Sequence, residues 1–349
     1  MCGRGKMNFH SMTIEQLQRK LKRRLSIWQE KMHTPSAQTK AVLDVWQPKN
    51  QTETVLLRWF MTEWCNFNCS YCPQNHDRKA SIGNGFTSHC FDNFPVEKWI
   101  DAFDRHFSDK QLSLVMTGGE PMLDFQNMHP FLKHMTARKQ VVSIRIDTNA
   151  SWKPEKYTDM DVSKITLMCT FHPGQVDEEV FYEKIKTLLS LNFKIGMINY
   201  VMDADNTPLY QTRFERFAAL GVYLHPNPLW GKQGEYAPAD LAMMKNRLPE
   251  ADYVYRNEIA KTIGKPCYFP SLSYEMNASG SIHAGCLYKK SVSFFDEELV
   301  ARPKGRVACP HQTCVCLDKY SFLEGVDRNN DLDPLNAYSK ALWEIHSKK

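Results

Sequence analysis

Short apolar runs alternate with longer amphipathic runs between about residues 54 and 230. The apolar runs are rich in Val, Ile and Leu and nearly continuous, which is typical of strands buried on both faces. They predict strands over Val55–Phe60, Leu112–Met116, Val141–Ile146, Lys164–Thr170, Lys194–Val201 and Val222–His225. The amphipathic runs predict helices over Val96–Phe107, Asn127–Arg138, Asp177–Leu189 and Pro208–Leu220. In the third of these helices, the predicted apolar stripe consists of Val180, Ile185, Leu188 and Leu189.

This alternation predicts parallel strands joined by right-handed crossovers. Six such strands fit a partial (β/α)6 TIM-like barrel better than a closed eight-stranded one, so the expected fold class is α/β. We expect the barrel over residues 51–232. A basic N-terminal extension over 1–50, with a helix over Ile14–Met32, would precede it. A C-terminal region over 233–349, with a last helix near Asn336–His346, would follow.

Length and composition narrow the class of protein. The chain has 349 residues, of which 42% are hydrophobic, enough to bury a substantial core. Its net charge of +5 is weak for this length and does not indicate a nucleic-acid binder. No apolar run is long enough to span a membrane, and the first residues do not have the pattern of a secretory signal. We therefore expect a cytoplasmic protein without a membrane partner.

Eleven cysteines need an explanation in such a protein. Clustered cysteines in a reducing compartment more often bind metal or take part in redox chemistry than form disulfides. Three of the eleven lie within Cys65–Cys72 and five within Cys267–Cys316. The sequence therefore predicts two separate cysteine sites.

The first group, Cys65, Cys69 and Cys72, has the spacing Cys-x3-Cys-x2-Cys and follows the first predicted strand. An α/β barrel carries its functional loops at such strand ends. A cubane iron–sulfur cluster normally takes four cysteine ligands, so three would leave one iron open to another ligand. A structural zinc site, with His76 as a fourth ligand, is the alternative.

This spacing, with Tyr71 directly before the third cysteine, resembles the signature of the radical SAM superfamily. The resemblance implies a [4Fe-4S] cluster with an open iron site on Cys65, Cys69 and Cys72. It also implies that S-adenosylmethionine binds beside the cluster, with its adenine in contact with Tyr71.

Further matches to this family follow at the ends of the next strands. Gly118-Gly119-Glu120 looks like the family's Gly-Gly-Glu motif, whose backbone and carboxylate receive the amino group of the SAM methionine. Glycines permit close approach to a ligand and a carboxylate accepts from an ammonium, although a plain Gly-Gly turn would look the same. Thr148-Asn149 resembles a Thr-Asn-Gly stretch that reaches the methionine or ribose, with Ala150 in place of Gly.

The fourth predicted strand ends in Cys169-Thr170-Phe171-His172-Pro173. Thr170 or His172 would face the barrel mouth and touch ribose or substrate; an ordinary loop position is the alternative for His172. Cys169 is a candidate hydrogen-atom donor to a substrate radical, although cysteine is more often a small core residue. The family often lays a backbone segment along adenine after the fifth strand, near Asn199–Met202.

The second cysteine group resembles the SPASM or twitch extensions of this family, which hold auxiliary iron–sulfur clusters. In those extensions one cysteine precedes a small hairpin that carries a glycine, here Gly280, and a second cysteine follows it. The resemblance implies one auxiliary [4Fe-4S] cluster held by Cys267, Cys286, Cys309 and either Cys314 or Cys316. A zinc knuckle is the alternative, and His283 or His311 would suit either site.

The resemblance also implies a reaction. One electron cleaves SAM to methionine and a 5′-deoxyadenosyl radical, which removes a hydrogen atom from the substrate. We expect an oxidoreductase that oxidises or epimerises a small polar metabolite, with an electron donor such as flavodoxin or ferredoxin. Modification of a ribosomal peptide or protein residue is the first alternative. An RNA-modifying radical enzyme using the basic run Lys20–Arg24, and a non-catalytic zinc-binding protein, are the others.

Overall fold

The computed structural model of the chain describes residues 54–72, 81–83, 86–203, 206–229, 235–248, 261–314 and 322–323. The predictions made for residues 1–50, for His76, for Cys316 and for a helix near residues 336–346 lie outside these ranges. No helix in the described ranges has both the length and the apolar character needed to cross a membrane.

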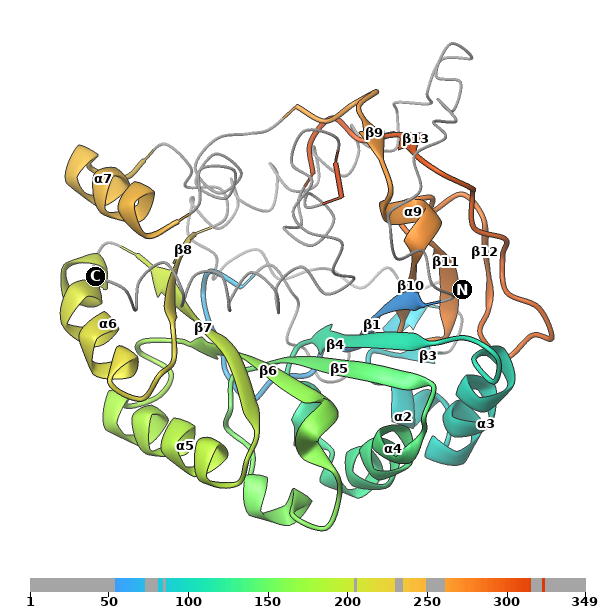
Figure 1. Ribbon diagram of the computed structural model, residues 1–349, viewed down its shortest axis with the longest axis horizontal. Coiled ribbons are helices and arrows are strands. Elements are labelled where there is room, and N and C mark those ends of the chain that lie inside the picture. The colour runs from blue at the N-terminus through green and yellow to red at the C-terminus, as the bar shows by residue number, and fades with distance from the viewer. Residues whose placement is uncertain are drawn as a thin grey trace, which may run out of the picture.

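One continuous, mostly parallel sheet of nine strands organises the chain (Figure 1). Six of its strands follow one another in chain order as β1 (Val55–Thr62), β4 (Leu112–Gly118), β5 (Val141–Thr148), β6 (Ile165–Phe171), β7 (Lys194–Met202) and β8 (Leu224–Pro228). Each strand is parallel to the next, so all six predicted strands and their order are confirmed. The described strands include no pairing of β8 with β1, and the sheet is therefore open, as in a partial barrel.

Helices between these strands cover the outer face of the sheet (Figure 1). The four predicted helices are confirmed as α3 (Val96–His106), α4 (Phe125–Ala137), α5 (Glu178–Ser190) and α6 (Tyr210–Ala218). Short elements fill the connections: β2 (Ser81–Gly83), β3 (Phe86–Thr87), α2 (Cys90–Asn93), η2 (Pro121–Leu123), η3 (Pro154–Tyr157), η4 (Val162–Lys164) and η5 (Thr207–Leu209). A further helix, α7 (Pro238–Arg247), follows β8.

Helix α5 shows how its sequence sets its ends and its buried face. Asp177 caps the N-terminus by accepting hydrogen bonds from the next turn. Phe181, Ile185 and Leu188 are buried, because positions i, i+4 and i+7 lie on one face of a helix. The apolar stripe predicted from the sequence was therefore wrong for Val180, which is 61% exposed because it precedes this face by one residue.

The two faces of β1 serve different parts of the fold. Leu57, Trp59 and Met61 point into the large core beneath the helices, where the Trp59 ring lies 4.6 Å from that of Trp99. Leu56 and Arg58 alternate with them, and Leu56 belongs to a second, smaller core. The face of β1 that carries Leu56 therefore packs against different residues from the face that carries Trp59.

That set comes from the C-terminal region. Strand β10 (Ser273–Asn277) pairs in parallel with β1, and β11 (Ser281–Ala284) and β12 (Ser291–Ser293) extend the same sheet antiparallel. The remaining described elements are β9 (Pro266–Cys267), α9 (Phe269–Leu272) and β13 (Val307–Ala308). The boundary expected at residues 232 and 233 stays a prediction, but the regions on either side of it share one sheet.

Candidate functional site

The first cysteine group lies in the loop that follows β1. Cys69 is buried, Cys65 and Cys72 are half-buried, and none of the three forms a disulfide. The loop folds on itself, since Cys72 N donates to Cys69 O at 3.1 Å and Phe67 N donates to Cys65 Sγ at 3.4 Å. The backbone thus closes a turn between Cys69 and Cys72 and donates to the sulfur atom of Cys65.

The glycine pair after β4 supports the start of this loop. Gly119 N donates to Thr62 O at 2.7 Å and Glu120 N donates to Trp64 O at 2.5 Å. A Cβ at Gly118 or Gly119 would overlap these carbonyl oxygens, and Gly118 has a φ of 139° that also favours glycine. The close approach that these glycines allow is therefore to the backbone of residues 62–64, whereas the sequence suggested approach to a ligand.

Glu120 is a buried anchor between β4 and β5. Its carboxylate accepts from Thr148 Oγ1 at 2.7 Å, Asn149 N at 2.6 Å and Met122 N at 3.2 Å. The side chain is 1% exposed, and this burial raises the pKa of Glu120 to about 7 despite the hydrogen bonds. Three of the predicted site residues are thus brought together by one carboxyl group.

Asn149 carries this connection to the cysteines. Its Nδ2 lies 3.7 Å from Cys65 Sγ and donates to Asn66 Oδ1 at 2.9 Å. The next residue, Ala150, has a φ of 58°, in the left-handed region that favours glycine. The backbone at this position thus keeps a glycine-like turn although the residue is alanine.

On the opposite side of the loop, His172 contacts the second cysteine. Its Nδ1 lies 3.5 Å from Cys69 Sγ and 3.0 Å from the Tyr71 hydroxyl. Burial is the main cause that raises the pKa of Tyr71, and the Cys69 thiolate adds to it. Gln175, three residues after His172, accepts from Asn68 N at 2.8 Å and so ties the β6–α5 connection to the cysteine loop.

The electrostatics of the loop suit a group that binds thiolates. Burial and, to a smaller extent, the thiolates of Cys72 and Cys65 raise the pKa of the Cys69 thiol to about 11, although a hydrogen bond with Tyr71 lowers it. The pKa of Cys65 is raised mainly by burial as well. Three mutually repelling thiolates would be stabilised by positive metal ions, and metal binding would release their protons. The donor set therefore fits an iron–sulfur cluster.

No set of three or more His, Cys, Asp or Glu side chains in the described ranges could hold a metal ion as placed. Ligands of a single ion converge on one point, whereas each thiolate of a cubane binds a different iron. The zinc alternative stays a prediction, because its proposed fourth ligand His76 lies outside the described residues.

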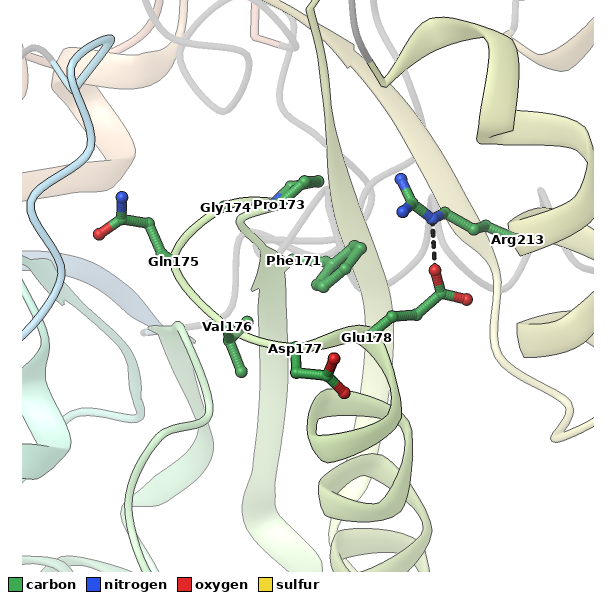
Figure 2. Close-up of a pocket in the computed structure, with 8 residues that line it drawn as sticks. All are labelled: Phe171, Pro173, Gly174, Gln175, Val176, Asp177, Glu178 and Arg213. Atoms are coloured by element: carbon green, nitrogen blue, oxygen red, sulfur yellow. Dashed lines mark hydrogen bonds and ion pairs between the residues drawn. The ribbon is translucent and has the colours of Figure 1, made fainter.

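An open hollow of about 490 Å³ lies at the β6–α5 connection (Figure 2). Its lining includes Phe171, Gln175, Asp177, Glu178 and Arg213. Arg213 Nε donates to Glu178 at 2.7 Å, the ion pair drawn in Figure 2. Polar and charged side chains thus share the lining of this hollow with Phe171, Pro173 and Val176.

Two predicted site residues of β6 do not contact the cysteine loop. Thr170 is half-buried beside Asn199 of β7, and none of the described hydrogen bonds connects it to the cysteine loop. Cys169 is 0% exposed and packs in the large apolar core beneath the helices, where burial raises its pKa. A hydrogen donor to substrate must face the barrel mouth, so the structure favours the packing role for Cys169.

The second cysteine group gathers in the smaller core. Cys267 and Cys309 are buried there with Leu56 and Phe269, and Cys286 and Cys314 pack against the same core at partial exposure; Val115 of β4 and Leu323 complete it. None of these four thiols forms a disulfide. Four of the five cysteines that the sequence grouped therefore meet beside β1 and β4, and the fifth, Cys316, lies outside the described ranges.

Backbone pairing places these cysteines. Val307 pairs with Cys267 across β13 and β9, and Cys309 N donates to Lys265 O at 2.9 Å. The predicted hairpin between Cys267 and Cys286 is present as β10 and β11, with Gly280 in its turn. The His311 Nε2 lies 3.3 Å from the Cys286 carbonyl oxygen, a backbone contact, so its described role is to hold the segment together.

Sequence reasoning missed two residues of the first site, Asn66 and Gln175. Both are polar residues in loops that follow strands of a parallel sheet, where such residues meet at one edge. That rule predicts His172 as a site residue, but it does not indicate which neighbouring loop residues contact the cysteine loop.

Comparison with known proteins gives structural likeness only. No family model matches the chain, and no curated protein matches it. A solved structure of histidine-tagged anSMEcpe with bound AdoMet is 11% identical, covers 84% of this chain and 93% of its own, and has a TM-score of 0.46. Streptococcus suis SuiB bound to precursor peptide SuiA is 14% identical, with 85% and 71% covered and a TM-score of 0.44. BtrN in complex with AdoMet and 2-DOIA is 15% identical, with 85% and 90% covered and a TM-score of 0.30. Likeness at this level establishes neither family nor reaction.

Proposed function

We propose that this chain is a radical SAM enzyme that removes a hydrogen atom from a polar substrate. One observation carries the proposal. Three cysteines with the spacing Cys-x3-Cys-x2-Cys lie in the loop after β1, and side chains from the ends of β5 and β6 contact two of their sulfur atoms. The loop residues would be ligands of a [4Fe-4S] cluster, and the strand ends around them would form the SAM site.

A reduced cluster, when bound, would supply one electron to the sulfonium of SAM, which would give methionine and a 5′-deoxyadenosyl radical. Cys65, Cys69 and Cys72 would each hold one iron and leave the fourth open. The chain would further keep water from the loop, since Cys69 and Glu120 are already buried.

Glu120 has a positioning role in this proposal. Its carboxylate already accepts hydrogen bonds from Thr148, from the Asn149 backbone and from Met122. A ligand ammonium would add to these bonds and favour the charged carboxylate over the neutral acid. Glu120 would thus hold Asn149 against Cys65 and present a negative group beside the cluster loop.

The position of Cys169 favours oxidation of the substrate over epimerisation. Epimerisation needs a hydrogen donor beside the substrate radical, and Cys169 packs in the apolar core instead. Oxidation needs a second electron to leave the substrate together with a proton. Cys267, Cys286, Cys309 and Cys314 supply the four thiols that an auxiliary cubane would need, and they pack against Leu56 and Val115 of the barrel strands. The substrate would then lose its second electron to this site.

The polar hollow beside His172 supports a polar substrate. Gln175, Asp177, Glu178 and Arg213 offer donors and acceptors at the carboxyl end of β6 (Figure 2). A small polar metabolite, or a polar residue of a peptide, matches such a lining better than an apolar molecule does. A small acidic electron carrier of the flavodoxin or ferredoxin kind would be the physiological reductant.

The test is anaerobic reconstitution with iron and sulfide, followed by reduction with dithionite in the presence of SAM. We expect bound iron and sulfide in cubane ratio and formation of 5′-deoxyadenosine. Cys69→Ala is expected to abolish both the iron at this site and the nucleoside product. Cys90→Ala is the matched control, because Cys90 is a fully buried core cysteine on α2. Zinc in place of iron, or product formation that survives Cys69→Ala, would end the proposal.

A further inference from the structure

We propose that His172 is a positioning residue that tunes the reduction potential of the cluster through a hydrogen bond to Cys69, given directly by Nδ1 or relayed by the Tyr71 hydroxyl. The inference rests on the proposed function and adds to it a residue whose role is neither ligand nor substrate contact. The sequence suggested ribose or substrate as the partner of His172, whereas in the structure its Nδ1 lies beside Cys69 Sγ and Tyr71 OH.

Three groups meet at this point. His172 Nδ1 is 3.5 Å from Cys69 Sγ and 3.0 Å from Tyr71 OH, and the Tyr71 and His172 rings are stacked with an interplanar angle of 12°. The Phe67 ring meets the imidazole edge-on, with centroids 5.8 Å apart. The imidazole is thus enclosed by two aromatic rings of the cysteine loop itself.

The imidazole is held there from its own side as well. Gln175 N donates to His172 O at 3.0 Å, and Gln175 Oε1 accepts from Asn68 N at 2.8 Å. The turn that carries His172 is therefore bonded to the loop that carries Cys69. The side-chain contacts of His172 and the bond from Asn68 N to Gln175 Oε1 together hold the ring nitrogen close to the sulfur atom.

Chemistry decides the direction of the hydrogen bond. A cysteine that binds metal is a thiolate, so its sulfur can only accept. If Nδ1 carried no hydrogen, its lone pair would face the lone pairs of the thiolate, which is unfavourable. A bound cluster therefore selects the tautomer with Nδ1–H, and the Tyr71 O–H is then free to point at the same sulfur.

Hydrogen bonds to cluster sulfurs are among the factors that set the potential of an iron–sulfur cluster. A donor favours the state with more negative charge, which is the reduced state, so His172 would raise the potential. Asn149 Nδ2 lies 3.7 Å from Cys65 Sγ and would donate to that sulfur in the same way. Two of the three ligand sulfurs would then each receive one N–H from the end of a neighbouring strand.

The experiment is a redox titration of the reconstituted, full-length protein followed by electron paramagnetic resonance. The cluster with the open iron is identified as the signal that changes when SAM is added. For His172→Leu we expect the reduced-to-oxidised ratio at a fixed potential to fall about tenfold, which is about 59 mV for a one-electron couple. His172→Asn keeps an N–H at the place of Nδ1 and should retain the wild-type ratio. Tyr71→Phe should lower the ratio in the same direction.

His129→Asn is the matched control, because His129 lies on α4 and pairs with the exposed Asp159. An unchanged ratio in His172→Leu overturns the inference, and so does an equal fall in His172→Leu and His172→Asn. If His172→Leu binds no cluster, the other two variants decide. A wild-type ratio in His172→Asn together with a lowered ratio in Tyr71→Phe then supports the inference, and any other pattern of these two ratios overturns it. A wild-type protein without iron overturns the proposed function itself, which separates the two failures.

Discussion

The Arg58 guanidinium lies 3.1 Å from the Glu275 carboxylate, and their side chains are only 7% and 4% exposed. This buried ion pair joins β1 to β10, although Arg58 and Glu275 are 217 residues apart in the chain. Tyr288 OH also donates to Glu275 at 3.4 Å. The pair thus fixes the C-terminal region against the barrel strand that leads into the cysteine loop.

Removing one member of this pair should destabilise the fold strongly. Glu275→Leu leaves a buried guanidinium without its carboxylate, and we expect a loss of about 3–5 kcal/mol in the free energy of unfolding. The double variant Arg58→Met, Glu275→Leu should recover most of that loss, because no buried charge is left uncompensated. Urea unfolding of the two single variants and the double variant measures the coupling. Glu183→Leu, which removes the exposed pair with Lys186, should cost far less than Glu275→Leu, and an equal loss in both pairs would contradict the prediction.

Glu120 should make the ligand-free protein less stable as the pH rises. Its pKa of about 7 in the folded protein exceeds its ordinary value of 4.5, so the folded state holds the proton more tightly than the unfolded chain. The associated stability is fully present below about pH 4.5 and is lost as the pH rises toward 7. A shift of this size corresponds to on the order of 3 kcal/mol.

The measurement is the difference in unfolding free energy between wild type and Glu120→Gln from pH 5 to pH 8. Glutamine cannot ionise, so its constant hydrogen-bonding cost shifts the curve without changing its slope, and the wild-type curve should fall relative to it. The exposed Glu97→Gln on α3 serves as the control. A pH-independent difference would show that Glu120 is ionised throughout.

Ala150 should tolerate glycine unusually well. Its φ of 58° costs an alanine about 1–2 kcal/mol, a strain that glycine avoids. Glycine loses about 0.8 kcal/mol for the buried methyl and some backbone entropy, so the net change should lie close to zero or be slightly stabilising. Ala102→Gly, in the buried middle of α3, should instead cost more than about 1 kcal/mol. Thermal unfolding of the two variants tests the contrast, and a similar loss in both would refute it.

The two cysteine groups should load with iron independently. If each holds a cubane, the reconstituted protein binds about eight irons, and Cys65→Ala, Cys69→Ala, Cys72→Ala together should leave about half. Cys267→Ala with Cys309→Ala should remove the other half and leave formation of 5′-deoxyadenosine in place. Iron and acid-labile sulfide analysis measures both. Loss of all iron from either variant would show that the groups form one site.

The strands, the helices and the position of the first cysteine group could be read from the sequence. Hydrophobic pattern and motif spacing are local properties, and the six strands and four main helices formed where that pattern lies. The grouping of Cys267, Cys286, Cys309 and Cys314 was likewise indicated by their nearness in the chain, and it survives in the fold. The error at Val180 shows the limit of such a prediction. An apolar residue one position away from the buried face of a helix looks, in the sequence, like part of that face.

Only the tertiary structure decided which functional atoms meet. Thr148 reaches Glu120 across 28 residues, and His172 reaches Cys69 across 103. Neither contact follows from spacing, because each depends on the register between strands and on the turn that a loop takes. Cys169 shows the same limit. A strand that is buried on both faces is apolar at every position, so its sequence does not reveal which side chains point to the helices and which to the mouth of the barrel.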